Sequence, residues 1–151
     1  MLSSKAKYGL NALVHLSKKY NRGPVLITDI AEEEQIPKKF LEAILLDLKN
    51  HGILESKKGK GGGYQLARHP SEIKLGYVVR ILDGPLAPVS CVSQTAYARC
   101  KECKDEHYCG IRLVMKDVRE AIANILDKTT LADMSSKIKE IKAGYTGTFQ
   151  I

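Results

Sequence analysis

The stretch from Ile36 to Leu66 constrains the fold more than any other part of the chain. After Pro37, apolar residues recur at three- and four-residue spacing, the pattern of a helix with one buried face: Phe40, Leu41, Ile44, Leu45 and Leu48. Pro37 suits the first helical turn, where its missing N–H is not needed. Gly52 follows the last turn, where a left-handed C-terminal cap favours glycine. We therefore predict a helix that starts at Pro37 and ends just before Gly52.

A hairpin is predicted directly after this helix. The segments Ile53–Ser56 and Gly63–Leu66 can pair as short strands around a tip of lysine and glycine. Upstream, a short helix from Asp29 to about Glu34 is separated from the longer helix only by a tight turn. Two short helices joined in this way form a helix-turn-helix outline, whose second helix enters the DNA major groove. The predicted fold class is mainly α with a small β-wing, a winged helix-turn-helix.

A second helical region is predicted in the C-terminal half of the chain. From Ile111 onward, apolar residues are spaced 3, 4, 4 and 3 apart: Ile111, Val114, Val118, Ile122 and Ile125. Such a stripe packs a helix along another helix, either in an ordinary core or across a dimer. We expect a long dimerisation helix, because the stripe follows a domain that has its own core and helix-turn-helix proteins act as two-fold dimers.

These patterns divide the chain into four parts. Residues 1–75 are expected to form the winged helix-turn-helix domain, and residues 76–110 a linker helix and a cysteine-rich sensor loop. Residues 111–135 are expected to hold the dimerisation helix and a short C-terminal helix, followed by a tail over residues 136–151.

The charge distribution favours an anionic partner. The net charge is +7, and residues 1–70 hold 12 basic but only 7 acidic side chains. Lys38 and Lys39, at the start of the recognition helix, can reach phosphate or guanine. Lys57 and Lys60 of the hairpin are expected to contact phosphates. No run is long and apolar enough for a membrane span, and no signal peptide is evident, so cytoplasm is the expected location.

All 4 cysteines lie between Cys91 and Cys109, in the spacing C-x8-C-x2-C-x5-C. In a reducing cytosol such a cluster indicates a metal, an iron–sulfur centre or redox sensing rather than structural disulfides. Soft thiolates select iron–sulfur clusters, zinc or copper(I). The pair Cys100 and Cys103 also fits a tetrahedral zinc site or a redox disulfide.

Taken together, these features resemble a family of bacterial winged-helix repressors. The family includes the iron–sulfur cluster biogenesis regulator, the nitric-oxide sensor and the cysteine-metabolism repressor. The resemblance covers roughly residues 1 to 135. It is carried by five segments: Lys7–Leu10, Ile36–Leu54, Gly61–Tyr64, Leu82–Gly84 and Thr130–Asp133. It implies a dimer whose long helices cross, with each cysteine loop near the partner's DNA-binding domain.

The resemblance also assigns roles on DNA. Glu42 occupies the position of a glutamate that can accept a hydrogen bond from a cytosine amino group. Lys58 occupies a wing position where family members often carry an arginine that inserts near the minor groove. Lysine keeps the charge there but lacks the planar fork of arginine.

For the cofactor, the resemblance implies three cysteines and a variable fourth ligand. Cys91 and Cys109 match the outer cysteines, Cys103 fits the middle one, and either Cys100 or His107 could be the fourth ligand. The histidine used by the iron–sulfur regulator is replaced here by Arg112. The expected cofactor is a [2Fe-2S] or [4Fe-4S] cluster, with zinc or no metal as alternatives.

The sequence thus predicts a homodimeric, sequence-specific DNA-binding regulator, a repressor on a palindromic operator, whose cysteine loop senses iron–sulfur, redox or nitric-oxide status. The alternative is a winged-helix protein-interaction module with a structural zinc or redox-thiol loop and no specific DNA site. No Ser/His/Asp or paired-carboxylate arrangement indicates an enzyme, although a thiol oxidoreductase using Cys100 and Cys103 stays open.

Overall fold

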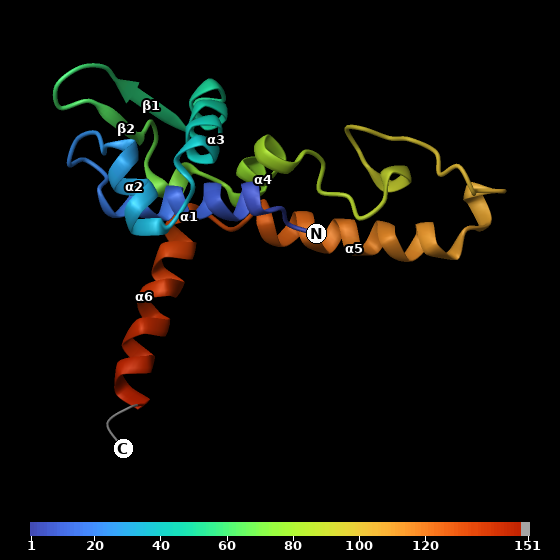
Figure 1. The fold of residues 1–151 in the computed structure, drawn as a ribbon. Helices are drawn as coiled ribbons and strands as arrows, with labels where there is room; N and C mark the ends of the chain where they lie inside the picture. The colour runs from blue at the N-terminus through green and yellow to red at the C-terminus, as the bar shows by residue number, and fades with distance from the viewer. Residues whose placement is uncertain (149–151) are drawn as a thin grey trace.

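The computed structural model describes the backbone of residues 1–148 and the side chains of residues 1–144. Over this range it contains six α-helices and one two-stranded antiparallel sheet, which confirms the predicted fold class (Figure 1). The elements in chain order are α1 Ser4–Lys18, α2 Ile27–Glu34, α3 Lys38–Asn50, β1 Leu54–Lys57, β2 Gly63–Leu66, η1 Pro70–Glu72, α4 Leu75–Asp83, η2 Ser90–Val92, η3 Glu106–Tyr108, α5 Gly110–Leu126 and α6 Leu131–Thr148. Across residues 1–148, no helix is long and apolar enough to span a membrane.

Helix α1 is the centre of the core. Ser3 caps its N-terminus, because the Ser3 hydroxyl accepts a hydrogen bond from the Ala6 N–H at 3.0 Å. The helix packs against α3 and α4 on one side and α6 on another. Gly9 allows the close approach of these helices, since a Cβ at this position would lie 2.3 Å from the Leu82 side chain of α4. The recognition helix α3 is therefore fixed to a well-packed support.

Helix α3 buries a single face: Leu41, Ile44, Leu45 and Leu48. At its C-terminus the Ile53 N–H bonds to the Leu48 carbonyl, and the Gly52 N–H bonds to the Lys49 carbonyl, both at 3.0 Å. This pair of hydrogen bonds forms a Schellman cap, and Gly52 adopts the required positive φ of 78°. The prediction of a glycine cap is thus confirmed.

The predicted burial of Phe40 is wrong, because 62% of its surface is exposed. Phe40 lies about 100° around the helix from Leu41, the nearest residue of the buried face. The buried face of α3 fills the space between α1 and α3, so Phe40 stays outside the core.

The wing is joined to the rest of the domain by a third extended segment. Strands β1 and β2 pair from Leu54 opposite Leu66 to Lys57 opposite Gly63. Val25 then bonds to the outer side of β2, since it exchanges two 2.8 Å backbone hydrogen bonds with Tyr64. Gly63 has φ of 142°, and a Cβ there would lie 2.2 Å from the Val25 carbonyl oxygen. Only glycine fits this position.

An ion pair and a backbone bridge link the helix-turn-helix half to α5 and α6. The Arg80 guanidinium of α4 donates two hydrogen bonds to Asp127, at 2.5 and 3.0 Å. This pairing raises the pKa of Arg80 and lowers the pKa of Asp127. Next to it, Lys74 and Thr130 form an isolated antiparallel bridge. Thr130 and Asp133 cap α6 reciprocally, each side chain accepting from the other's N–H.

The final helix is longer than predicted. The sequence indicated a short helix ending near residue 135 and a tail from residue 136 that is loosely ordered from Gly144, whereas α6 continues to Thr148. Met134 and Ile138 pack against the core. Beyond them the helix continues past Gly144, because its lysine and glutamate residues have high helix propensity. The remaining predicted tail, residues 149–151, lies outside the described residues.

The wing geometry predicts a large difference between two glycine substitutions. Gly63→Ala should reduce the free energy of unfolding by about 2–3 kcal/mol, because it combines a strained φ with a backbone clash. Gly59 also has positive φ, but no atom lies within 4 Å of the place that a Cβ would take, so Gly59→Ala should cost only about 1 kcal/mol. Urea unfolding and amide exchange at Val25 and Tyr64 measure both effects. Equal losses for the two variants would contradict the close approach at Gly63.

Candidate functional site

Helix α3 and the wing lie on the same side of the molecule, at the top of Figure 1, and form a continuous candidate DNA surface. The structure exposes every side chain that the sequence predicted to contact DNA: Lys38, Lys39, Glu42, Lys57, Lys58 and Lys60. No salt bridge in residues 1–148 occupies any of them. Five cationic groups and one carboxylate are therefore accessible on this surface.

The start of α3 is open as well as basic. Pro37 is the N-cap residue, and no side chain caps the first turn. The backbone N–H groups of that turn thus lack a side-chain acceptor, and the helix dipole adds partial positive charge beside Lys38 and Lys39. A DNA phosphate is the kind of group that such a helix start can bind.

The wing tip is shaped by a tight turn. The Gly62 N–H donates to the Gly59 carbonyl at 3.0 Å, and Lys57, Lys58 and Lys60 surround this turn. The bridge between Val25 and Tyr64 attaches β2 to the domain close to the wing tip. The role of Val25 was not predicted from the sequence. The available signal was a β-branched residue directly after Gly23 and Pro24, but Val25 is distant in sequence from the hairpin that it contacts.

Helix α5 extends to the side of the domain and has no buried residue (Figure 1). Its predicted apolar stripe lies on one face, and its ends are strongly exposed: 69% for Ile111 and 66% for Ile125. Between them Val114 and Val118 are also exposed. A 17-residue helix with an uncovered apolar face is unusual for a single soluble chain.

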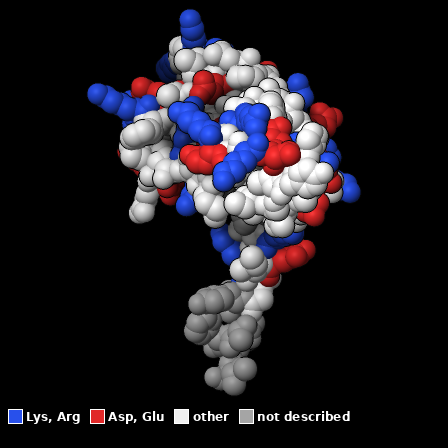
Figure 2. All heavy atoms as spheres, turned by 90° about the vertical axis from the view of Figure 1, so that its right-hand side faces the viewer, with Lys and Arg blue, Asp and Glu red and all other residues white. Residues whose placement is uncertain are grey.

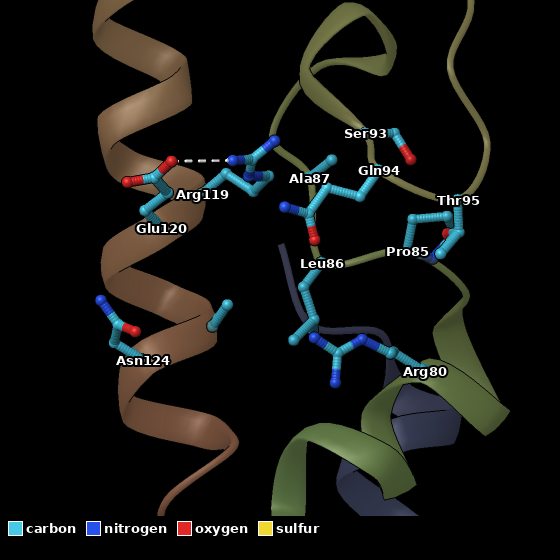
Figure 3. Close-up of a pocket in the computed structure, with 11 residues that line it drawn as sticks. Arg80, Pro85, Leu86, Ala87, Ser93, Gln94, Thr95, Arg119, Glu120 and Asn124 are labelled. Atoms are coloured by element: carbon cyan, nitrogen blue, oxygen red, sulfur yellow. Dashed lines mark hydrogen bonds and ion pairs between the residues drawn. The ribbon is translucent and has the colours of Figure 1, made fainter.

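The cysteine loop connects α4 to α5, and the first part of the loop is hydrogen-bonded to α5. Arg119 of α5 donates a 2.6 Å hydrogen bond to the Val92 carbonyl, and Val92 is buried. Figure 3 shows Arg119 between Glu120, its salt-bridge partner on the same helix, and the loop. This anchor could not be predicted from the sequence, because an arginine on a polar helix face gives no signal of its partner.

A cavity of about 270 Å³ separates this part of the loop from α4 and α5 (Figure 3). Its lining is mostly polar and includes Arg80, Gln94, Arg119 and Asn124. The loop therefore contacts the helices at a few anchor points and is not packed along its whole length.

The four thiols are free and occupy different environments. Cys91 lies in the anchored turn η2, and Cys109 caps α5, where its sulfur accepts a 3.5 Å hydrogen bond from the Arg112 N–H. Cys100 is exposed and donates to the Glu102 carboxylate at 2.9 Å. This hydrogen bond raises the pKa of the Cys100 thiol, so its thiolate forms less readily.

The structure does not bring the predicted metal ligands together. Among residues 1–144, whose side chains the structure describes, no three His, Cys, Asp or Glu side chains are placed to hold a metal ion. The predicted ligands Cys91, Cys103, Cys109, Cys100 and His107 are among the residues searched. The donor types suit an iron–sulfur cluster, but this arrangement of the loop does not fit one. Basic and acidic side chains are intermixed on the molecular face that contains the loop (Figure 2).

Arg112 is a further difference from a cluster-binding loop. It occupies the position of the expected histidine ligand, and a guanidinium does not ligate iron. Its Nε is buried and has no hydrogen-bond partner among the described residues. Any fourth ligand must therefore come from another residue.

A helix-turn-helix followed by a basic wing defines the chain as a winged helix-turn-helix protein, a class that binds double-stranded DNA. Comparison with known proteins identifies the family. The model of the Rrf2 family, described as iron-dependent transcriptional regulator, matches residues 2–137, and the chain belongs to this family.

Named relatives agree with this assignment. An rrf2-like HTH-type transcriptional regulator of Rhodobacter capsulatus is 40% identical over 137 residues, which cover 89% of this chain and 91% of the relative. The structure of CymR, the global cysteine regulator of B. subtilis, superposes with a TM-score of 0.75 at 31% identity, covering 91% of this chain and 97% of CymR. IscR of T. potens gives a TM-score of 0.74 at 30% identity, with coverage of 93% and 90%.

The chain is thus an HTH-type transcriptional regulator that binds DNA, and the predicted resemblance is confirmed. The alternative of a protein-interaction module without a DNA site is not favoured by these comparisons. The family is one of transcriptional regulators rather than enzymes.

Proposed function

We propose that the chain acts in the cytoplasm as a homodimeric repressor that binds a palindromic operator. The observation that carries this proposal is the uncovered apolar face of α5. Exposed isoleucine and valine side chains gain about 25 cal/mol for each Å² of apolar surface buried. Antiparallel packing of this face against a second α5 would cover the stripe and leave α3 and the wing of each protomer free.

On DNA, we assign positioning and reading to different residues of the same surface. Lys57 and Lys60 neutralise phosphates, and Lys58 enters or borders the minor groove beside the wing. Lys38 and Lys39 meet phosphate or guanine at the edge of the major groove, while Glu42 accepts from a cytosine amino group. The exposed positions of these six side chains support the assignment.

We further propose that the cysteine loop is the sensor of the protein. The family description as iron-dependent and the thiol-rich donor set support an iron–sulfur cluster, with Cys91, Cys103 and Cys109 as ligands. Either Cys100 or His107 would complete the set. The loop must rearrange to gather these ligands, and its few anchor points permit this movement. Zinc binding and thiol oxidation are the competing chemistries.

The DNA assignment predicts a change in salt dependence. Lys38→Ala should weaken operator binding about tenfold and reduce the slope of log affinity against log salt by about 2 in the dimer, one phosphate contact per protomer. Lys139→Ala is the matched control, since this exposed lysine lies on α6, which leads away from α3 in Figure 1. Fluorescence anisotropy on a footprinted operator measures both. If Lys38→Ala behaves as Lys139→Ala does, Lys38 does not contact DNA.

The sensor assignment predicts a coloured protein after anaerobic purification. Visible absorbance with matched iron and sulfide should be lost in Cys91→Ala, Cys103→Ala and Cys109→Ala. Cys100→Ala and His107→Ala identify the fourth ligand: the variant that loses the absorbance removes that ligand, and the other variant serves as the matched control. Stoichiometric zinc without iron would make the loop a structural zinc site. A colourless, metal-free protein that binds its operator would indicate thiol-based sensing instead.

A further inference from the structure

We propose that an exposed apolar row on the recognition helix reads thymine methyl groups in the major groove. The row consists of Phe40, Ala43 and Leu46, and it rests on the proposed function of α3 as the helix that enters this groove. It would make the operator half-site rich in A·T pairs at the positions that the row covers.

The row is exposed for a structural reason. Phe40 is 62% and Leu46 is 49% exposed, and Ala43 is also exposed. Residues spaced by three follow one inclined row on a helix surface. The buried face of α3 is already complete without them, since Leu41, Ile44, Leu45 and Leu48 are all at most 1% exposed. Folding of the single chain therefore does not account for Phe40 and Leu46 being apolar.

Double-stranded DNA is the occupant that the surroundings favour. Lys38 and Lys39 precede the row, Lys49 follows it, and the basic wing lies on the same side of the molecule. A surface that is cationic at its borders and apolar at its centre complements a groove with phosphates along its edges and methyl groups on its floor. The C5-methyl of thymine is the apolar group that A·T and T·A pairs present in the major groove.

The length of the apolar row also matches the spacing of base pairs in DNA. Phe40 and Leu46 are six residues apart, which is about 9 Å along a helix. Base pairs are stacked at intervals of about 3.4 Å, so a row lying along the groove covers about three consecutive pairs. Glu42 lies on the exposed side of the same helix, and in the proposed arrangement it accepts from a neighbouring cytosine. Methyl contacts and one polar contact would together define the half-site.

Uracil substitution tests this proposal, because uracil lacks only the methyl group of thymine. An operator is first selected from random DNA with the intact chain. Each thymine of the half-site is then replaced by uracil, and affinity is measured for the wild type, Phe40→Ala, Leu46→Ala and a control, Ile141→Ala. Ile141 is 68% exposed on α6. We expect about fourfold weaker wild-type binding at each contacted position. In Phe40→Ala or Leu46→Ala this loss should largely disappear at one of those positions, while Ile141→Ala should behave as the wild type.

The outcomes separate this proposal from the function on which it rests. If no operator can be selected, sequence-specific DNA binding itself fails. If an operator is selected but uracil is tolerated at every position, DNA binding stands and the methyl-reading role is overturned. Uracil penalties that persist unchanged in both alanine variants overturn it as well.

Discussion

Burial of one face of α3 is the interaction on which the DNA-reading surface depends. Leu41, Ile44, Leu45 and Leu48 are removed from water against α1 and its neighbours, and each contributes about 2 kcal/mol relative to an exposed side chain. This packing fixes the rotation of the helix, so the lysines at its start and the glutamate one turn later must face outward. The Schellman cap at Gly52 then directs the chain straight into β1. The relative placement of helix and wing is therefore a consequence of core packing.

The second half of the chain depends on a different kind of contact. The Arg80–Asp127 pair and the backbone bridge at Thr130 fix the C-terminal end of α5 to the DNA-binding domain, while the rest of α5 has no core of its own. The same helix carries Cys109 at its start and Arg119, the anchor of the cysteine loop. A dimer formed through α5 would place the loop, the interface and the DNA-binding domain on one connected element. A change in the loop could then alter how the two reading surfaces are spaced.

The sequence was sufficient for the parts of the fold that rest on local rules. Helical periodicity, the glycine cap and the hairpin signals predicted α3, the wing and α5. The charged residues that the sequence predicted to contact DNA are exposed in the structure. Phe40 was misassigned because periodicity describes spacing and cannot tell where the buried arc ends. The length of α6 was underestimated because its support comes from α1, which is distant in sequence. The arrangement of the cysteines could not be derived either, since loop conformation depends on individual contacts such as that of Arg119.

The most direct test of this account is hydroxyl-radical footprinting of the intact chain on its selected operator. A dimer formed through α5 should give two equivalent protected segments related by two-fold symmetry, with their centres roughly 34 Å apart or a multiple of that distance. This result would show that two winged helix-turn-helix domains bind together at a spacing fixed by α5. A single asymmetric protected segment at saturation, or uniform protection without a preferred site, would contradict the proposed dimeric regulator.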